Sequence, residues 1–292
     1  MAAQTVSVVI PTLNEGANLV DTVRYVLLNS GAELLEVVIA DDGSSDGSAE
    51  AIREEFGEAP VRIVPGGGGV ARSRNAGARV AKGEVLVFLD GHCYVPEGWL
   101  RPLTEALEAD DAGLAGPAFT SIRDPRMRAC GVTWRDPSLG NVWLPCTDSV
   151  APVPFHIGAC QAVRAGAFWD AGGYDEGMTK WGSEDIELCL RMWLLGYAVL
   201  AQPATLVYHL FRTSRSYDVD ARLIMYNHLR LALLHFDETT LDKIVGQMLA
   251  FPEVEKSLAM AMTDGTWQRR QELLARRKRS FEWFRRRFGM TF

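Results

Sequence analysis

The stretch from Lys82 to Trp99, KGEVLVFLDGHCYVPEGW, joins an apolar run to residues that can hold a metal. Val85–Leu89 is a short β-branched and aliphatic block, which is typical of a strand buried on both faces of a parallel sheet. Asp90 lies where this strand should end, and His92 follows Gly91. Open α/β sheets bind ligands at the carboxyl edge of their strands, so a carboxylate and an imidazole here indicate a divalent cation site. For this motif taken alone, a turn aspartate beside a surface histidine is the simpler alternative.

Polar side chains also follow the strands predicted before this stretch. Val6–Ile10, which Pro11 should end, and Leu35–Ala40 are short apolar runs separated by a helical pattern. Asp41 and Asp42 come directly after the second run. A strand, a helix and a strand in succession form a βαβ unit, so these carboxylates should lie at the same edge as the metal motif. A carboxylate there could accept the N3 proton of uracil, and a polar turn with a helix cap is the simpler alternative.

A glycine-rich stretch follows the third predicted strand, Val61–Val64. It has the sequence PGGGGVARSRNAGARVAKG over residues 65–83, and a helix should begin just after the glycines. Glycines let backbone amides approach a ligand, and a helix N-terminus attracts anions. The stretch matches neither the P-loop nor the G-x-G-x-x-G fingerprint, so the glycines alone are weak evidence. Arg72, Arg74 and Asn75 add donors that could meet a base, a ribose or a diphosphate.

The middle of the chain is irregular and rich in proline before a second block of candidate residues. Trp134 and Trp143 could be core residues or platforms for a sugar ring. Gly182–Asp185 should form the N-terminus of a helix whose apolar stripe faces the core. The helix dipole favours acidic residues at that end, but it does not account for Trp181. His209 ends a further predicted strand, and alone it would indicate a buried core histidine.

The chain of 292 residues carries a net charge of −7 that is unevenly distributed. Residues 268–292 contain nine Lys or Arg and two Glu, a charge of +7, so the remainder carries −14. An acidic body does not bind nucleic acid by charge. The tail, residues 267–288, is predicted to form a basic amphipathic helix that lies on an anionic membrane. The alternative is that it packs on the acidic body or on a second subunit of a homodimer.

The cysteine pattern and the N-terminus bear on the cellular compartment. The five cysteines are an odd number without a C-x-x-C pair, which predicts reduced thiols rather than a disulfide framework or a structural zinc site. The N-terminus lacks the pattern of a signal peptide, and no apolar stretch approaches the roughly 18 residues needed to span a bilayer. We therefore expect a cytoplasmic protein, at most peripheral to the inner face of a membrane.

Five motifs occur in the order found in a known family. They are VSVVIPTLNE, VVIADDGSSDGS, GVARSRNAGARVAKGEVLVFLDGHC, GGYDEGM and WGSEDIELCLRMW. Together they resemble glycosyltransferase family 2, which has the GT-A fold. The resemblance implies an α/β protein with a doubly wound, mostly parallel, Rossmann-like sheet and a helical C-terminal extension. It also implies a nucleotide site made of Pro11, Glu15, Asp41 or Asp42, Arg72, Arg74 and Asn75, with Asp90 opening the metal motif.

One position departs from the family pattern. The usual second Asp of the metal motif is His92 here, and D-x-H resembles the polypeptide N-acetylgalactosaminyltransferases. Those enzymes pair this motif with a later histidine in a segment similar to VYHLFR, which implies Asp90, His92 and His209 as ligands of one divalent cation. One oxygen and two nitrogen donors suit manganese, with magnesium as the alternative. Their W-G-G-E-N-L-E run is similar to WGSEDIE, and we place Trp181 and Gly182 at the donor site.

These residues predict a metal-dependent glycosyltransferase of the hexosyl type. It would move a sugar from a nucleotide sugar, with uridine expected, to the hydroxyl of a saccharide, lipid-linked or peptide acceptor. We assign Asp185 as the base, with Glu184 beside it, which predicts inversion at the anomeric carbon. The N-acetylgalactosaminyltransferases retain the configuration and have Asn where this chain has Asp185, so retention is the alternative.

Two alternatives belong to other classes of protein, a nucleotidyltransferase and a non-catalytic protein that binds a nucleotide or a sugar. Sugar choice should depend on the pocket around His156, Gly158, Ala159 and Cys160. The chain divides into three predicted parts: residues 1–110 as the nucleotide-sugar-binding half, 111–217 as the acceptor-binding half, and 218–292 as the helical extension.

Overall fold

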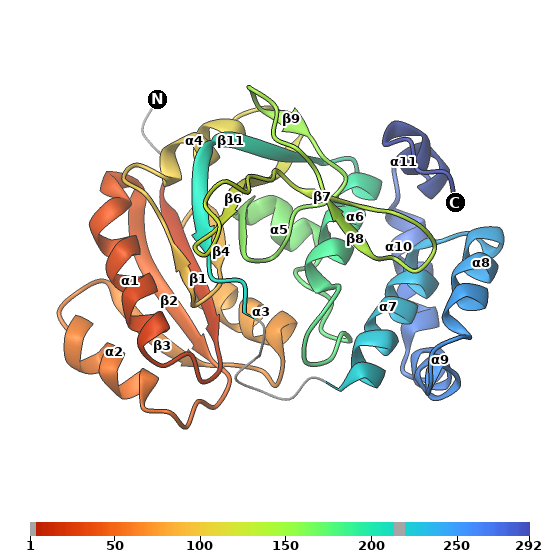
Figure 1. Ribbon diagram of the computed structural model, residues 1–292, viewed down its shortest axis with the longest axis horizontal. Helices are drawn as coiled ribbons and strands as arrows, with labels where there is room; N and C mark the ends of the chain where they lie inside the picture. Colours follow the sequence, from red (N-terminus) through yellow and green to blue (C-terminus); the bar gives the residue numbers. More distant parts are fainter. Residues whose placement is uncertain (1–3, 213–219) are drawn as a thin grey trace.

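The computed structural model describes residues 4–212 and 220–292, and a mixed sheet lies at its centre (Figure 1). The first part of the sheet is parallel, in the order β3-β2-β1-β4. Successive side chains of β1 point to opposite faces, so Val8 and Ile10 pack in the cluster that contains α1, and Val9 packs in the cluster that contains α3. The elements are β1 (Val6–Thr12), α1 (Ala17–Asn29), β2 (Leu34–Asp41), α2 (Ser48–Phe56), β3 (Val61–Pro65), α3 (Val70–Val80) and β4 (Val85–Leu89), with a 3-10 turn at Gly31–Glu33.

Pro11 does not end β1, so that prediction is wrong. The strand pairs with β4 only as far as Val9, whereas its pairing with β2 continues to Thr12. Beyond Val9 the strand has a neighbour on one side alone, and such a position tolerates a residue without an N–H. The prediction of a strand over Val85–Leu89 is confirmed, and all five of its residues are buried.

The sheet continues beyond β4 in the order β4-β10-β6-β11-β5. The prediction of a mostly parallel sheet is confirmed for β3-β2-β1-β4 and for the β6-β11 pair, whereas strand β10 (Cys160–Arg164) runs antiparallel to both of its neighbours. Strands β6 (Ala112–Ser121) and β11 (Ala198–His209) pair in parallel, and they bring His209 beside β5 (Cys93–Tyr94). The short β9 (Ala151–Pro152) pairs with β11. Because β11 ends at His209 against β5, this histidine lies next to the end of the metal motif.

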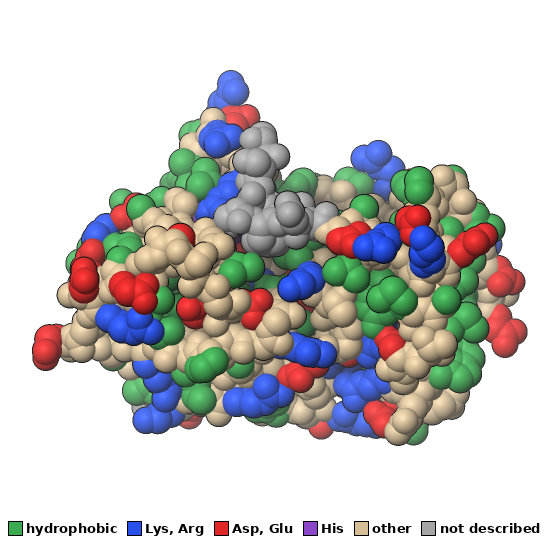
Figure 2. Space-filling model, turned by 90° about the horizontal axis from the view of Figure 1, so that it is seen from below, with side chains coloured by type: hydrophobic (Ala, Val, Ile, Leu, Met, Phe, Trp, Pro, Cys, Tyr) green, Lys and Arg blue, Asp and Glu red, His purple; other side chains and the backbone are tan. Residues whose placement is uncertain are grey.

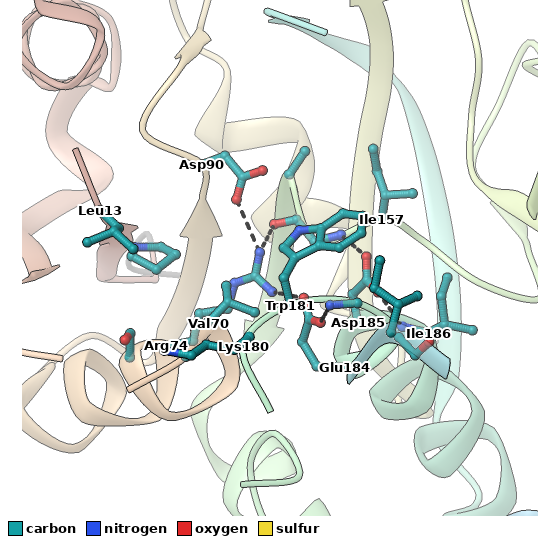
Figure 3. Close-up of a pocket in the computed structure, with 18 of the residues that line it drawn as sticks. Leu13, Val70, Arg74, Asp90, Ile157, Lys180, Trp181, Glu184, Asp185 and Ile186 are labelled. Atoms are coloured by element: carbon teal, nitrogen blue, oxygen red, sulfur yellow. Dashed lines mark hydrogen bonds and ion pairs between the residues drawn. The ribbon is translucent and has the colours of Figure 1, made fainter. Parts of the chain in front are cut away.

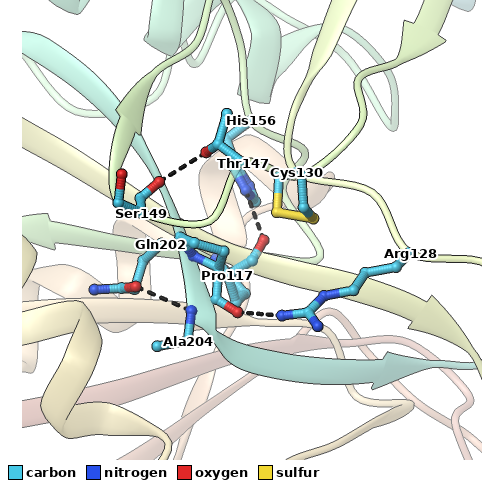
Figure 4. Close-up of a disulfide and its surroundings, with 10 residues drawn as sticks. Pro117, Arg128, Cys130, Thr147, Ser149, His156, Gln202 and Ala204 are labelled. Carbon is cyan, nitrogen blue, oxygen red and sulfur yellow. Dashed lines mark hydrogen bonds between the residues drawn. A yellow bond between two sulfur atoms is a disulfide. The ribbon is translucent and has the colours of Figure 1, made fainter.

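A small hairpin between the two halves carries the one disulfide of the described residues (Figure 4). Strands β7 (Val132–Trp134) and β8 (Asn141–Trp143) pair with each other, and Cys130 and Cys146 on either side are bonded, with Cα atoms 4.8 Å apart. The prediction of five reduced thiols is therefore wrong for two of them. Sequence spacing does not show that the hairpin brings residues 130 and 146 together. The free cysteines, all buried, are Cys93, Cys160 and Cys189.

Helix α6 (Glu184–Leu195) is central to the second half of the molecule. It is joined to α7 (Ala221–His235) through a buried ionic group in which Glu187 accepts hydrogen bonds from Arg191 Nε at 2.8 Å and pairs with His235 Nε2 at 2.7 Å. Burial lowers the pKa of His235 to about 4, although the Glu187 carboxylate opposes this shift. The two short helices flanking the sheet are α4 (Leu100–Ala106) and α5 (Ala165–Ala171).

The chain ends in helices that gather on the side away from β1–β3 (Figure 1). The single helix predicted for residues 267–288 is instead α10 and α11 with a break between them, so that prediction is wrong. Phe281 and Phe284 are buried in the core, and the N–H groups of Lys278 and Arg279 donate to the carbonyl of Leu194 at the end of α6. The tail thus packs on the body through Phe281 and Phe284, whereas Trp267 and Leu274 of the proposed apolar face are exposed, and the membrane contact stays a prediction. These helices are α8 (Glu238–Met248), α9 (Val254–Thr263), α10 (Thr266–Arg276) and α11 (Phe281–Arg287).

Three further features concern the predicted organisation. Acidic and basic side chains are interspersed on the face that Figure 2 shows. Among the described residues, none of the helices combines the length and the apolar character required to cross a bilayer. The predicted boundary at 217/218 lies outside the described residues, and the division at 110/111 stays a prediction.

Candidate active site

A cavity of about 550 Å³ opens at the carboxyl ends of β1, β2 and β4, beside the end of β11 and the N-termini of α3 and α6 (Figure 3). This is the edge at which ligands of open α/β sheets bind. Its volume falls in the range of small-molecule sites. The predicted site residues that line it are Pro11, Glu15, Asp42, Arg74, Asp90, His92, Trp181, Gly182, Glu184, Asp185 and His209.

Asp90, His92 and His209 form one cluster in this cavity. Their ligand atoms lie within 4.8 Å of one another, and the two imidazole rings have their centroids 4.8 Å apart. His209 Nε2 lies 3.7 Å from Asp90 Oδ2. Burial alone would raise the pKa of Asp90, but His209, Arg74 and His92 outweigh it and hold that pKa well below its usual range. A carboxylate that stays ionised beside two imidazoles is a suitable donor set for a transition metal.

The surroundings of the cluster fit a bound cation. His209 Nδ1 is buried and makes no hydrogen bond with any described residue. Burial lowers the pKa of His209, which keeps the imidazole neutral as metal binding requires. Glu15 Oε2 lies 3.3 Å from His92 Nδ1, and the same carboxylate pairs with Arg212. Glu15 was predicted to hold the nucleotide, and here it supports the orientation of a candidate metal ligand.

Arg74 connects the metal cluster to the acidic pair on α6 (Figure 3). Its side chain is only 2% exposed, and its guanidinium donates to Glu184 Oε1 at 2.8 Å and to Asp90 Oδ1 at 3.1 Å. The same group donates to the carbonyl of Gly158 at 2.9 Å and lies 5.2 Å from the centre of the Tyr174 ring. This buried guanidinium therefore offsets a carboxylate at each end of the site.

Glu184 and Asp185 are held by backbone amides at the start of α6. Gly182 N–H donates to Glu184, and the N–H groups of Gly158 and Ile186 donate to the two oxygens of Asp185 at 2.6 and 2.8 Å. Burial raises the pKa of both carboxyl groups, and their mutual repulsion adds to the rise for Glu184. Asp185 lines the cavity, so a carboxyl group with a raised pKa faces the space that a substrate would occupy.

The glycine-rich loop packs against the segment before α6. Val70 N–H donates to the carbonyl of Lys180, and Gly69 forms a parallel bridge with Lys180. A Cβ on Gly69 would lie 2.9 Å from Lys180 N, so the close approach requires glycine. Lys180, Gly182 and Ser183 all have positive φ, at 56°, 110° and 70°. Such conformations cost energy in residues other than glycine and are concentrated at functional sites.

Three predicted nucleotide residues do not line the cavity. Arg72 is exposed and donates to the carbonyl of Glu176 at 3.1 Å. Asn75 is buried, where its amide bonds the backbone of Tyr174. Asp41 accepts the N–H of Ser44 at 2.9 Å, whereas its neighbour Asp42 lines the cavity and accepts the N–H of Gly68 at 2.6 Å.

The cavity also has walls that the sequence did not reveal. The hairpin contributes buried Trp134, for which core packing was one of two predictions, whereas Trp143 is exposed and does not line the cavity. Of the four residues expected to shape sugar choice, Gly158 and Ala159 line it. Helical spacing shows that Ile224, His228 and Leu231 share one face of α7, but it does not show that this face lines the cavity. Arg212 lies three positions after the predicted ligand His209. The lining residues not predicted are Leu139, Gly140, Asn141, Ile157, Lys180, Phe211, Arg212, Ile224, His228 and Leu231, among others.

Two family models match the chain. Residues 7–137 match glycosyl transferase family 2, and residues 151–213 match a model described as the N-terminal domain of galactosyltransferase. The first segment contains Asp90 and His92, and the second contains Glu184, Asp185 and His209. The two matched segments therefore meet in the cavity.

Relatives and solved structures give a consistent comparison. The chain is 29% identical to the probable N-acetylgalactosaminyltransferase 9 of Caenorhabditis elegans over 82% of this chain and 48% of that protein. It is 30% identical to polypeptide N-acetylgalactosaminyltransferase 8 of Drosophila melanogaster over 84% of this chain and 45% of that protein. The chain thus spans about half the length of these relatives. The crystal structure of GalNAc-T7 with UDP, GalNAc and Mn2+ superposes with a TM-score of 0.80 at 23% identity, covering 99% of this chain and 57% of that one.

Proposed function

Residues 7–137 are a glycosyltransferase family 2 domain within a GT-A fold, and from this premise we propose that the protein transfers a sugar from a uridine nucleotide sugar to an acceptor hydroxyl. The observation that carries the proposal is the convergence of the Asp90, His92 and His209 cluster with Glu184 and Asp185 in one cavity. Asp42, the residue after β2, lines the cavity, and its carboxylate could accept the N3 proton of a uracil base. The GalNAc-T7 structure, which shares the fold, contains UDP and so supports the same choice.

The metal cluster would hold one divalent cation, manganese or magnesium. When bound, the cation neutralises the charge of the donor diphosphate and so makes it a better leaving group. Asp90 would supply the oxygen ligand, and His92 and His209 would supply nitrogen ligands. Arg74 fixes the Asp90 carboxylate from the opposite side, and Glu15 contacts His92.

Asp185 would act as the base in an inverting transfer. Its carboxylate takes the proton of the acceptor hydroxyl, the hydroxyl oxygen bonds to the anomeric carbon, and the bond from that carbon to the diphosphate oxygen breaks. The nucleoside diphosphate leaves with the electron pair. Burial raises the pKa of Asp185, which brings its proton affinity closer to what a base needs at neutral pH.

Retention of configuration is the second candidate, and two observations favour it. The metal cluster combines one aspartate with two histidines, and the similar relatives are N-acetylgalactosaminyltransferases. In addition, both oxygens of Asp185 accept backbone N–H groups, which suits a residue that orients the donor sugar. The anomeric configuration of the product separates the two candidates.

A donor-hydrolysis assay with and without manganese tests the proposal. It uses UDP-glucose, UDP-galactose, their N-acetylamino counterparts and GDP-mannose as the panel. We expect manganese-dependent release of UDP, and Asp185→Asn should lower transfer by about 10²- to 10⁴-fold while sparing UDP binding. No release from any donor in the presence of manganese, together with no binding of UDP, would show that the protein is not this enzyme.

NMR of the fresh product from an α-linked donor then decides the stereochemistry. A β linkage supports Asp185 as the base. An α linkage excludes inversion, and Asp185 would then be a residue that orients the donor.

A further inference from the structure

The turn that precedes α6 carries side chains of the cavity on a backbone that needs outside support. Lys180, Trp181, Gly182 and Ser183 all line the cavity, and three of the four have positive φ. For Lys180 and Ser183, which are not glycine, such a conformation persists only where the surroundings fix it. We call residues 179–183 the α6 turn, and contacts from other elements must hold it in shape.

One buried side chain of α7 contacts four backbone groups of the α6 turn. Asn227 Oδ1 accepts the N–H of Thr179 at 2.9 Å. Its amide nitrogen donates to the carbonyl of Thr179 at 2.9 Å, to that of Trp181 at 3.2 Å and to that of Gly182 at 2.9 Å. Asn227 is 0% exposed and does not line the cavity. Its polar atoms are therefore directed at the turn rather than at a ligand.

The α6 turn is also held from the side of α3. Val70 N–H donates to the carbonyl of Lys180 at 2.8 Å, and Gly69 forms a bridge with the same residue. These contacts fix Lys180, whereas the carbonyls of Trp181 and Gly182 accept hydrogen bonds from Asn227. Asn227 therefore orients the part of the turn that is nearest to the acidic pair in the chain.

The chain before the turn is anchored to α7 independently of Asn227. Arg230 donates to both carboxylate oxygens of Asp175, at 2.7 and 3.0 Å. Tyr226 donates to the carbonyl of Gly177 at 2.9 Å. Removal of the Asn227 amide would therefore leave residues 175–177 in place and release the turn that follows them.

A displaced turn would move the acidic pair but not the metal ligands. Gly182 N–H donates to Glu184 Oε2 at 2.9 Å, and Trp181 lies beside Glu184 and Asp185 in the cavity (Figure 3). Asp90 directly follows β4 and His209 is the last residue of β11, so the sheet holds both. Loss of Asn227 should therefore disturb the chemistry of transfer more than the binding of nucleotide and metal.

We propose that Asn227 is a positioning residue of the transfer reaction. Through the α6 turn it fixes Trp181 and the Glu184–Asp185 pair in the cavity, at the place where the donor sugar reacts. The inference rests on the proposed function, because it takes this cavity as the donor site. It also gives α7, the first helix of the C-terminal extension, a part in the reaction.

Asn227→Asp tests this role with almost no change in the shape of the side chain. The oxygen that replaces the amide nitrogen faces three carbonyl oxygens, and even a protonated carboxyl group has one hydrogen where the amide has two. A misplacement of about 1 Å in a catalytic site costs about 10²-fold in rate, so kcat for donor hydrolysis should fall by about that factor. In calorimetry, the dissociation constant of UDP with manganese and the number of UDP sites per chain should not change.

Ser257→Ala is the matched control. The Ser257 hydroxyl is also buried and donates to the carbonyl of Arg222 in α7 at 3.0 Å, but it does not contact the α6 turn. This variant should lower the free energy of unfolding and leave kcat unchanged. If Asn227→Asp does not fold, Asn227→Ala takes its place, because it removes the same hydrogen bonds without adding an acceptor and leaves room for water.

Hydrogen exchange measures the order of the turn without reference to activity. Peptides that span residues 178–186 should exchange faster in the Asn227 variant than in wild type or Ser257→Ala, and peptides around Asp175 should exchange alike in all three. An unchanged kcat, unchanged exchange in residues 178–186, or a loss of UDP affinity as large as the loss of kcat would overturn the inference and leave the proposed function standing. Wild-type protein that binds no UDP and releases none from any donor would instead refute the proposed function, and with it the reaction that Asn227 serves.

Discussion

Replacement of Gly158 by alanine tests the arrangement around Arg74. A Cβ at position 158 would lie 2.6 Å from Arg74 Nη2, 2.7 Å from Nη1 and 2.9 Å from Cζ, all closer than atoms can approach. The end of a flexible side chain can usually move away, but this guanidinium is buried and bonded to Glu184 and Asp90. The Gly158 N–H also holds Asp185, so a shift of the backbone would disturb the second carboxylate instead.

The magnitude follows from the contacts that are lost. Hydrogen bonds to charged groups contribute about 1.5 to 3 kcal/mol each, and Arg74 makes one to Glu184 and one to Asp90. If both break, the free energy of unfolding should fall by about 3 to 5 kcal/mol, the usual cost of breaking a buried ion pair. If only the bond to Asp90 breaks, the loss should be about 1.5 to 3 kcal/mol.

Chemical denaturation measures this loss, and donor hydrolysis measures its effect on the site. Gly166→Ala is the matched control, because Gly166 lies in α5 and an added Cβ there meets nothing within 4 Å. That control should be neutral or gain about 0.5 to 1 kcal/mol. If Gly158→Ala unfolds at the same denaturant concentration as Gly166→Ala and hydrolyses donor at the wild-type rate, Arg74 is not fixed at Gly158 and the argument fails.

Three further predictions concern the metal, the backbone and pH. His209→Ala should weaken manganese binding by about ten-fold or more, and unchanged affinity in calorimetry would remove His209 from the ligand set. Ser183→Gly should raise the free energy of unfolding by about 1 kcal/mol in denaturant melts, because φ at Ser183 is 70° and glycine adopts this conformation without cost. His235 has its pKa lowered from 6.5 to about 4, so the unfolded chain binds a proton that the folded chain does not, and stability falls as pH drops through this interval. His235→Gln should remove about 1.4 kcal/mol per pH unit of that fall, and identical pH profiles for the two proteins would contradict the assignment.

Strand ends were the part of the site most accessible from the sequence. Short apolar runs are followed directly by Asp41 and Asp42 or by Asp90, which places these side chains at the sheet edge, and Asp42 and Asp90 line the cavity. The helix after the glycines was harder to interpret in detail. Arg72 and Arg74 are two residues apart, which is about 200° around a helix, so they point in nearly opposite directions. Arg74 faces the cavity and Arg72 faces Glu176, and the periodicity alone could have shown that only one of them reaches the site.

The rest depended on contacts between segments far apart in the chain. Strand β6 contains Gly113, Gly116 and Pro117, which obscure a strand pattern, although its ten residues are all buried. Strand β10 follows the hairpin and runs antiparallel to β4. Its five-residue apolar pattern predicts a strand but does not indicate whether that strand pairs in parallel or antiparallel with its neighbours. Ile224, His228 and Leu231 line the cavity because α7 packs against α6. No local pattern encodes that packing.

The Cys130–Cys146 disulfide makes one part of the cavity sensitive to reduction, namely the part formed by the hairpin, and leaves the metal cluster outside the cross-linked loop. It closes a loop with a sequence separation of 16 residues, and this loop carries Trp134 and Leu139. A cross-link that closes a loop of this length lowers the entropy of the unfolded chain and so adds about 3 kcal/mol to the free energy of unfolding. The strands that carry Asp90 and His209 lie outside this loop. The disulfide also weakens the argument for a cytoplasmic location, which was based in part on free thiols. In protein prepared with a strong reductant, we therefore expect the Asp90, His92 and His209 cluster to keep its geometry and Trp134 and Leu139 to lose their fixed positions in the cavity.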